Sequence, residues 1–433
     1  MIQTVSDTMT ETMSETLSDT LDSLETRAPE QRERELMARL PGLIARAQSA
    51  PGWNRILAGV NANAINSRAA LATLPVTRKS DLHALQKRQV PFGGLNTTPV
   101  GQLARVYMSP GPIFDPEGRS QDWWRFARPM YAAGVRPGGL LQNCFSYHFT
   151  PAAFMVEGGA ARIGCAVIPA GAGQTEMQVQ AISELRPDTY VGTPSFLKII
   201  IEKAQEMGAD ISSIKQAMLG AEALPESLRA WFATHGVPLA LQMYASADIG
   251  SIAYETSSGG VRVPGMVLDE DVILEIVRPG SGDPVPEGEI GEVVVTVFNP
   301  DYPLIRFATG DLSAILAGGP VSPCGRTNTR IQGWLGRADQ TTKVRAMFVH
   351  PSQVHEVTRR HPQIVKARLV VSGSMAQDVM TLHCEVADPA GASASAIVES
   401  IRELTKLRGE VRFVANGSLP SDGKVIDDIR DYK

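Results

Sequence analysis

The sequence predicts an α/β fold with a large N-terminal domain, built from βαβ units and an antiparallel subdomain, and a small α+β C-terminal domain. Between residues 138 and 194, short β-rich runs alternate with longer helical stretches, which is typical of parallel βαβ units. Strand-like runs separated by turns rich in proline and glycine follow after residue 250. Residues 336–433 have a strand and helix alternation of their own, which indicates a separate small domain.

Length and composition narrow the class of protein. The chain has 433 residues, of which 43% are hydrophobic, so it can bury a sizeable core in two or more domains. Its net charge of −5 argues against a protein that wraps nucleic acid, and its four scattered cysteines argue against a disulfide framework. Its apolar runs are far shorter than the roughly 20 residues of a membrane span. We therefore expect a cytoplasmic enzyme without a nucleic-acid or membrane partner.

Residues 1–28 form a low-complexity acidic extension with a near four-residue repeat. Apolar and acidic side chains recur on neighbouring helical stripes, but threonine is a poor helix former and the acids repel one another. The pattern leaves open a disordered tail or a helix docked on the body or on a partner. We expect no chemical role for this segment and place the domains at residues 29–335 and 336–433.

The first elements after the extension are helices. Residues 32–50 carry apolar side chains at helical spacing, among them Leu36 and Leu40. Strands at residues 166–168 and 189–191 flank a helix at residues 176–185, which predicts a parallel unit.

The later elements are mostly strands. Residues 272–277 and 292–297 are strongly β-prone and are separated by a turn region at residues 279–291, which predicts an antiparallel pair. In the last domain, residues 367–371 and 381–386 are the expected strands.

Five short segments occur in the order and at roughly the spacing of the core motifs of adenylate-forming enzymes. They are Gly220-Ala221-Glu222 and residues 243–248, 305–311, 336–339 and 419–424. Each alone is a weak signal, whereas five in order are a strong one. Over residues 32–433 the chain resembles this superfamily and, within it, the phenylacetate–CoA ligase family. The resemblance implies an AMP-forming carboxylic acid–CoA ligase that uses ATP, Mg²⁺ and coenzyme A.

The resemblance also assigns the nucleotide site. It implies that Gly220-Ala221-Glu222 and Tyr244 frame and stack the adenine, since a flat ring is bound by an aromatic side chain and close backbone. It implies that Asp311 accepts the ribose hydroxyls and that Arg337 holds the ribose or a phosphate. A lone tyrosine is usually a packed aromatic and a Gly-Asp pair is usually a turn, so the ordered context carries these assignments.

By the same resemblance, Asp248 takes the place of the acid that carries magnesium against the phosphates. The sequence departs from the superfamily here, because Ala247 lacks a phosphate-binding hydroxyl and Asp248 is shorter than the usual glutamate. Residues 107–118 depart further: a Ser/Thr/Gly-rich phosphate loop ending in lysine is expected there, but the segment contains three prolines. Proline has no N–H with which to cradle phosphate, so we expect a weakened grip on pyrophosphate.

The acyl pocket of such enzymes lies between the βαβ strands and the adenine motif. The candidates that this implies are Phe145, Tyr147, His148 and Ser195. Clustered aromatic side chains suit a flat apolar acid, which favours an aromatic or arylacetic substrate. The alternative is that residues 145–149 are an ordinary buried strand with alternating faces.

The C-terminal domain of the resembled family is mobile. The resemblance places a hinge at Asp339, the adenylation lysine at Lys424, and Lys343 and Arg345 on the face that turns toward CoA. Lys424 is expected to bridge the carboxylate and the α-phosphate, although an exposed lysine near a terminus usually serves only solubility.

Some relatives of this family bind a structural zinc ion, and rough alignment places the ligand positions at Thr256, Val267, Ser322 and Cys324. Only one thiol is present there, whereas a tetrahedral site needs four ligands, so no zinc is expected. The sequence leaves open a homodimer. It also leaves open two other functions: acyl transfer to a carrier protein or an amine, and a non-catalytic relative that binds acyl-CoA or nucleotide.

Overall fold

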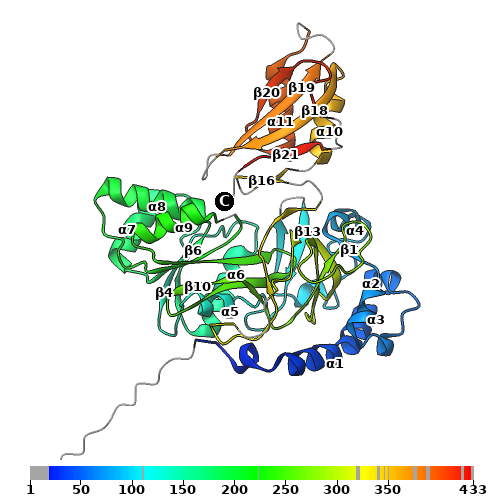
Figure 1. The fold of residues 1–433 in the computed structure, drawn as a ribbon, viewed down its shortest axis with the longest axis vertical. Helices are drawn as coiled ribbons and strands as arrows, with labels where there is room; N and C mark the ends of the chain where they lie inside the picture. Colours follow the sequence, from blue (N-terminus) through cyan, green and yellow to red (C-terminus); the bar gives the residue numbers. More distant parts are fainter. Residues whose placement is uncertain are drawn as a thin grey trace, which may run out of the picture.

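The computed structural model describes residues 19–109, 112–222, 224–317, 322–338, 342–345, 347–349, 351–373, 378–386, 391–420 and 424–430. A large domain carries a small domain at one end (Figure 1). Among the residues that the structure describes, no helix is both long and apolar enough to cross a membrane.

Helices along one side of the large domain begin the fold (Figure 1). The first long helix, α1 (Pro29–Gln48), buries Leu36 and Leu40 on the apolar stripe expected from the sequence, and a proline in its first turn favours its start. The shorter helices and turns that follow are α2 (Pro51–Ile56), η2 (Ala62–Ala64), α3 (Arg68–Ala72), η3 (Lys79–Asp81), α4 (Leu82–Arg88) and η4 (Val100–Gln102).

Residues 19–28 form a segment that we call the N-terminal strap, with the short helix η1 (Ser23–Thr26) at its centre. Glu25 is fully buried, with its carboxylate bonded to the guanidinium of Arg326 and to the Tyr254 hydroxyl at 3.0 Å. Asp22 contacts Arg128 and Arg162 at 3.0 and 2.9 Å. The strap was assigned to the extension by the sequence, yet in the structure it packs against the body, while residues 1–18 lie outside the described residues.

An eight-stranded sheet forms the centre of the large domain, and five of its strands are parallel. The strand order is β14-β10-β9-β8-β7-β6-β4-β5. The parallel strands are β4 (Leu140–Asn143), β5 (Ala166–Ile168), β6 (Thr189–Gly192), β7 (Gln216–Leu219) and the first part of β8 (Leu239–Ser246). The antiparallel continuation consists of β9 (Gly250–Ser258), β10 (Val261–Leu268) and β14 (Arg330–Ile331). All residues of β6 are buried, as expected for a strand covered on both faces.

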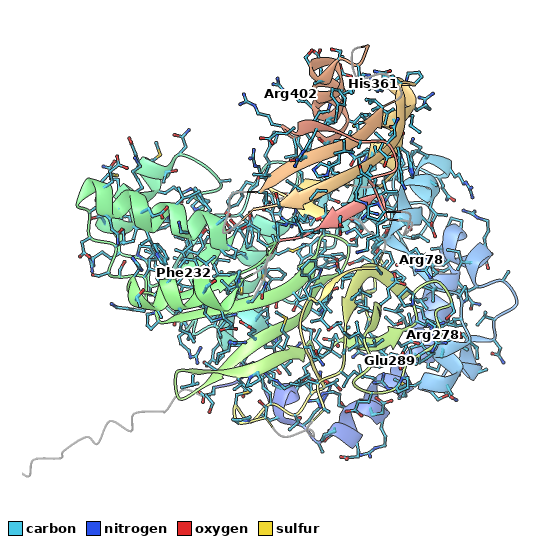
Figure 2. The ribbon with its side chains drawn as sticks, turned by 45° about the horizontal axis from the view of Figure 1, so that its top comes forward. Arg78, Phe232, Arg278, Glu289, His361 and Arg402 are labelled. Carbon is cyan, nitrogen blue, oxygen red and sulfur yellow. The ribbon has the colours of Figure 1, made fainter. Side chains whose placement is uncertain are left out.

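Helices complete the predicted βαβ units. The helices between successive parallel strands are α6 (Ala152–Ile163), α7 (Thr175–Leu185), α8 (Pro194–Met207) and α9 (Glu226–Thr234), whereas α5 (Ala127–Ala132) precedes β4. Phe232 of α9 is fully buried in the layer where α7, α8 and α9 gather (Figure 2).

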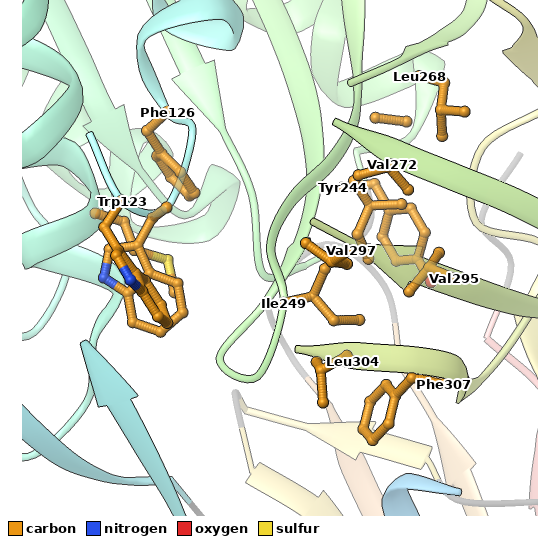
Figure 3. Packing of buried hydrophobic residues seen from close by; sticks show 14 of the residues in the cluster. Trp123, Phe126, Tyr244, Ile249, Leu268, Val272, Val295, Val297, Leu304 and Phe307 are labelled. Carbon is orange, nitrogen blue, oxygen red and sulfur yellow. The ribbon is translucent and has the colours of Figure 1, made fainter. Parts of the chain in front are cut away.

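A second sheet has the strand order β1-β13-β12-β11, with β15 paired to β13. Its strands are β1 (Thr77–Arg78), β11 (Val272–Val277), β12 (Gly291–Val297), β13 (Leu304–Ser313) and β15 (Gly336–Arg337). Strand β11 has the bounds that the sequence predicts. Apolar side chains such as Val295, Leu304 and Phe307 pack in one cluster with Tyr244 of the first sheet and Ile249 of the turn after β8, so the core joins the two sheets (Figure 3).

The proline-containing segment forms an antiparallel hairpin of β2 (Arg105–Ser109) and β3 (Ile113–Glu117). We call these two strands, residues 105–109 and 113–117, the proline hairpin. The Gln86 amide of α4 anchors this hairpin by donating to the Phe114 carbonyl and accepting from the Phe114 N–H, both at 2.8 Å.

The small domain has its own core. Its sheet has the order β20-β19-β18-β21, and residues such as Leu369, Leu382 and Ile397 are buried within it. His361 and Arg402 lie on this domain (Figure 2). The elements are β16 (Thr342–Val344), β17 (Met347–Val349), α10 (Pro351–Arg360), β18 (Ile364–Ser372), β19 (Val379–Val386), α11 (Ala394–Thr405), β20 (Glu410–Val414) and β21 (Ile426–Asp428).

Candidate active site

The candidate residues of the large domain gather at one edge of the central sheet. Residues 145–149 follow β4, residues 193–195 follow β6, residues 220–222 follow β7 and residues 247–249 follow β8. Because these strands run in parallel, their carboxyl ends meet at the same edge, which is where ligands bind in open α/β sheets.

Tyr244 and Asp311, which come from different sheets, meet in the structure. The Tyr244 hydroxyl donates to Asp311 Oδ2 at 2.8 Å, and Trp334 Nε1 donates to Asp311 Oδ1 at 3.0 Å. These two donors hold the carboxylate in place, and a carboxylate oxygen can accept more than one hydrogen bond. The two oxygens of a fixed carboxylate can thus accept the vicinal hydroxyls of a ribose.

The segment Gly220-Ala221-Glu222 turns sharply beside Tyr244. A Cβ on Gly220 would lie 2.9 Å from Met243 Cε, so a larger residue here would require the Met243 side chain to shift. Ala221 has a φ of 68°, a left-handed conformation that is unfavourable for alanine and is enriched at functional sites. The Glu222 carboxylate accepts from the backbone N–H of Ser195 at 3.2 Å, which joins the adenine segment to the acyl-pocket candidate Ser195.

Asp248 lies in the turn after β8 and is 3% exposed. Its Oδ2 atom forms an ion pair with the ammonium of Lys79, a residue that the sequence did not single out, and lies 3.4 Å from Ser246 Oγ. Lys79 follows β1, which pairs with β13, so the second sheet brings this cation to Asp248.

Asp115 of the proline hairpin lies beside Asp248 and is fully buried. Ser109 Oγ donates to Asp115 Oδ2 at 2.7 Å. Burial raises the pKa of the Asp115 carboxyl well above its usual value, and the neighbouring charge of Asp248 raises it further.

These two aspartates fit a hard divalent cation such as Mg²⁺. The Oδ1 atoms of Asp115 and Asp248 are both buried and have no hydrogen-bond partner among the described residues. Carboxylate oxygens are the ligands that Mg²⁺ prefers.

The acyl-pocket candidates lie in a loop. Residues 145–149 form no strand, so the alternative of a buried strand with alternating faces is wrong. Phe145 is buried, whereas His148 is exposed. The Tyr147 hydroxyl donates to Glu157 Oε1 at 2.6 Å and accepts from Asn143 Nδ2 at 2.9 Å. Burial raises the pKa of Tyr147, and its bond to Glu157 adds to the rise, so Tyr147 stays a neutral donor.

The small domain touches the adenine segment through Lys343. The Lys343 ammonium donates to the carbonyl of Ala221, whereas Arg345 contacts Asp378 within its own domain. Lys424 Nζ lies 3.6 Å from Asp427 Oδ1. Lys424 also lines a surface hollow of the small domain together with Lys366. The two lysines assigned to different steps thus lie in different surroundings.

Two candidates remain, Arg337 for the nucleotide and Asp339 for the hinge. Arg337 lies in β15, where its backbone pairs with Asp311 of β13. Asp339 lies outside the described residues.

Three of the four aligned zinc positions lie together in the structure. Cys324 Sγ is 3.2 Å from Ser322 Oγ and 3.3 Å from Thr256 Oγ1, and Arg330 donates to both hydroxyls at 3.1 Å. Burial alone would raise the pKa of the Cys324 thiol, but hydrogen bonds from Ser322, Thr256 and Arg326 together lower it to about 7. Among the described residues, no group of three or more His, Cys, Asp or Glu side chains is placed to hold a metal ion.

Comparisons with known proteins identify relatives of this chain. Residues 132–297 match the family described as AMP-binding enzyme. The chain is 31% identical over 381 residues to a phenylacetate–coenzyme A ligase of Thermus thermophilus, which covers 84% of each chain. It is 29% identical over 354 residues to the Escherichia coli enzyme of the same name, which covers 77% of this chain and 78% of that one.

The fold is also shared with a solved ligase. The 2-hydroxyisobutyryl-CoA ligase bound to 2-HIB-AMP and CoA in its thioesterification state superposes with a TM-score of 0.82 at 24% identity, covering 95% of this chain and 92% of that one. The same ligase in its postadenylation state gives a TM-score of 0.68 at 23% identity, covering 94% and 91%.

Lys79, Asp115 and Trp334 were missed from the sequence. Asp115 could have been noticed as an acid in a loop where a lysine was expected, because that change reverses a charge. Lys79 and Trp334 carry no signal in a single sequence, since a lone lysine or tryptophan usually has no special role.

Proposed function

We propose, from the premise that the chain belongs to the phenylacetate–CoA ligase family of AMP-forming acid–CoA ligases, that its substrate is an aromatic or arylacetic acid. The observation that carries the nucleotide part of this proposal is the meeting of Tyr244, Asp311 and Gly220-Ala221-Glu222 at the carboxyl ends of parallel strands. The aromatic side chains of Phe145 and Tyr147 beside this site support a flat apolar acyl group.

The first step forms an acyl-adenylate. A carboxylate oxygen attacks the α-phosphorus of ATP, the bond between the α-phosphorus and the bridging oxygen breaks, and pyrophosphate leaves. Asp311 holds the ribose, Tyr244 and residues 220–222 hold the adenine, and the Lys424 ammonium neutralises charge between the carboxylate and the α-phosphate. Magnesium, when bound with the nucleotide, supplies positive charge against the phosphates, and Asp248 would hold it.

The second step forms the thioester. The sulfur of CoA attacks the acyl carbon, the bond from that carbon to the AMP oxygen breaks, and the thiol proton goes to solvent. The contact of Lys343 with the Ala221 carbonyl, and the position of Lys424 in a hollow of its own domain, support an arrangement suited to this step. The TM-score with the solved ligase is higher for its thioesterification state than for its postadenylation state, which also supports this arrangement. We infer that the small domain alternates between two orientations.

Pyrophosphate release, measured with a panel of carboxylic acids with and without CoA, tests the proposed function. Release is expected with arylacetic or aromatic acids, and a thioester is expected only when CoA is present. Release without thioester formation would indicate a carrier protein or an amine as the acceptor. Absence of release with every acid would contradict the proposal and favour a binding protein.

A further inference from the structure

The region beneath the proline hairpin contains a charge imbalance. Asp115 and Asp248 are 0% and 3% exposed, and the only cation paired to them in the described residues is Lys79. With both carboxyl groups ionised, this buried unit would carry one uncompensated negative charge. Burying such a charge is costly unless a proton or a cation neutralises it.

Unpartnered polar atoms gather around the same unit. Besides the Oδ1 atoms of Asp115 and Asp248, the hydroxyl of Tyr302 is buried here, with the Gln86 amide as a polar neighbour. Tyr302 is 1% exposed and lies close enough to both aspartates to sense their charge. Since buried polar groups are nearly always paired, the two Oδ1 atoms indicate either a proton shared between the carboxyl groups or a ligand with affinity for oxygen.

The Oδ2 atom of each of these two aspartates has a partner. Ser109 occupies Oδ2 of Asp115, and Lys79 occupies Oδ2 of Asp248. Each aspartate is thus held by one oxygen, and the two carboxyl groups lie close enough to interact with each other. This arrangement orients two carboxylates from different segments without using up their capacity to bind a metal ion.

We propose that Asp115 is a second carboxylate ligand, with Asp248, for the magnesium ion that accompanies ATP. Mg²⁺ is commonly bound by one or two carboxylates, several waters and substrate phosphates, which matches two inward oxygens and a nucleotide. The proposal rests on the proposed function, because the nucleotide supplies the remaining ligands.

The charges of this arrangement suit a polyphosphate. Two carboxylates, Lys79 and Mg²⁺ sum to one positive charge, whereas the two carboxylates and Lys79 alone sum to one negative charge. The proline hairpin would then hold the phosphates through a carboxylate-bound metal in place of the backbone N–H groups that its prolines lack. The carboxylate-bound metal would thus compensate for the N–H groups that the expected phosphate loop would have supplied.

Binding of Mn²⁺ in place of Mg²⁺ tests the proposal without relying on activity. The full chain is titrated with Mn²⁺, and free Mn²⁺ is followed by electron paramagnetic resonance, both without nucleotide and with a non-hydrolysable ATP analogue. Asp115→Asn and Asp248→Asn are each expected to weaken Mn²⁺ binding by about tenfold or more with the analogue present. Glu117→Gln is the matched control, because Glu117 is a buried acid of the same hairpin that bonds Tyr107 and Arg105, and it should leave Mn²⁺ affinity unchanged within about twofold.

Two results would overturn the proposal. If Asp248→Asn weakens Mn²⁺ binding and Asp115→Asn does not, Asp115 is not a ligand. If neither variant weakens it, the carboxyl pair shares a proton, and Asp115→Asn should then raise the melting temperature by removing a buried acid. A failure of the proposed function is distinguishable, since it would abolish acid-dependent pyrophosphate release in the parent protein while leaving the Mn²⁺ titration interpretable.

Discussion

At the scale of single residues, Asp311 shows how the candidate nucleotide site is held. Its two carboxylate oxygens are fixed by donors from different segments, the Tyr244 hydroxyl and the Trp334 indole. Trp334 lies two residues before β15, whose backbone pairs with Asp311, so the indole and the strand position the same carboxylate. We regard Trp334 as a positioning residue because it acts on the ribose through Asp311.

Trp334→Phe should therefore weaken ATP binding more than catalysis. Loss of an N–H donor to a charged acceptor costs about 1.5–3 kcal/mol, so the KM for ATP should rise by about 10- to 100-fold while kcat changes little. Steady-state kinetics at saturating acid and CoA measure both constants. Trp231→Phe is the matched control, because Trp231 stacks on His235 in α9, and equal effects of the two variants would contradict the role of Trp334.

Cys324 is a second residue whose surroundings give a measurable property. The hydroxyls of Thr256 and Ser322 link Arg330 to the Cys324 sulfur. Both hydroxyls accept from the Arg330 guanidinium and can donate to the thiolate. Cys144, Cys165 and Cys384 are buried or partly buried thiols whose pKa values are raised by burial.

We predict that Cys324 is the cysteine among these four that titrates near neutral pH. Because its folded-state pKa of about 7 lies below its usual value of about 9, its contribution to stability is present above pH 9 and is lost as pH falls through about 7. Arg330→Met should raise this pKa, as measured by the pH dependence of thiolate absorbance. An unchanged titration curve in Arg330→Met would show that the guanidinium does not act on the thiol.

At the scale of elements, the N-terminal strap holds buried charges in pairs. Its residue Glu25 is fully buried against Arg326, which is 2% exposed, and the backbone carbonyl of Asp19 also accepts from Arg326 at 2.8 Å. The Glu25 carbonyl accepts from the N–H of Thr327 at 3.0 Å, so the strap continues the hydrogen bonding of the body. Such a pair is costly to break, because the remaining charge stays buried.

Glu25→Gln should destabilise the large domain by about 3–5 kcal/mol, since it leaves the Arg326 guanidinium buried without its carboxylate. Denaturant unfolding at an unchanged m-value measures this loss. Glu30→Gln, at an exposed position just after the strap, should change the free energy of unfolding by less than about 0.5 kcal/mol. Equal stability of the two variants would mean that Glu25 contributes no more than a surface acid.

At the scale of the whole molecule, the small domain presents different lysines to the large domain in the two proposed steps. Lys343 contacts the adenine segment in the observed arrangement, and Lys424 lies within its own domain. A residue that serves one orientation should matter for one step only.

Lys424→Ala should lower acid-dependent pyrophosphate release by about two to three orders of magnitude, because it removes an electrostatic contribution to the transition state. Turnover of a supplied acyl-adenylate with CoA should stay within about tenfold of the parent. Lys406→Ala, an exposed lysine of the same domain, serves as the control. Equal losses in both assays would show that Lys424 is structural or that the domain does not alternate.

The sequence by itself determined the periodic elements and the order of the motifs. The apolar stripe of α1, the continuous β-prone runs of β11 and β12, and the alternation that builds β4–β6 follow from local patterns, because a helix or strand must bury one face or both. The motif at Gly220 is recognised in the sequence, whereas its packing against Met243 depends on the pairing of β7 with β8.

Only the tertiary structure decided which charges meet. Lys79 and Asp248 are 169 residues apart, and Glu25 and Arg326 are 301 residues apart. No local pattern encodes such pairs, because their approach depends on how the two sheets and the strap pack together. The loop at residues 145–149 was likewise decided by its place after a strand end, where the backbone turns away from the sheet and exposes His148.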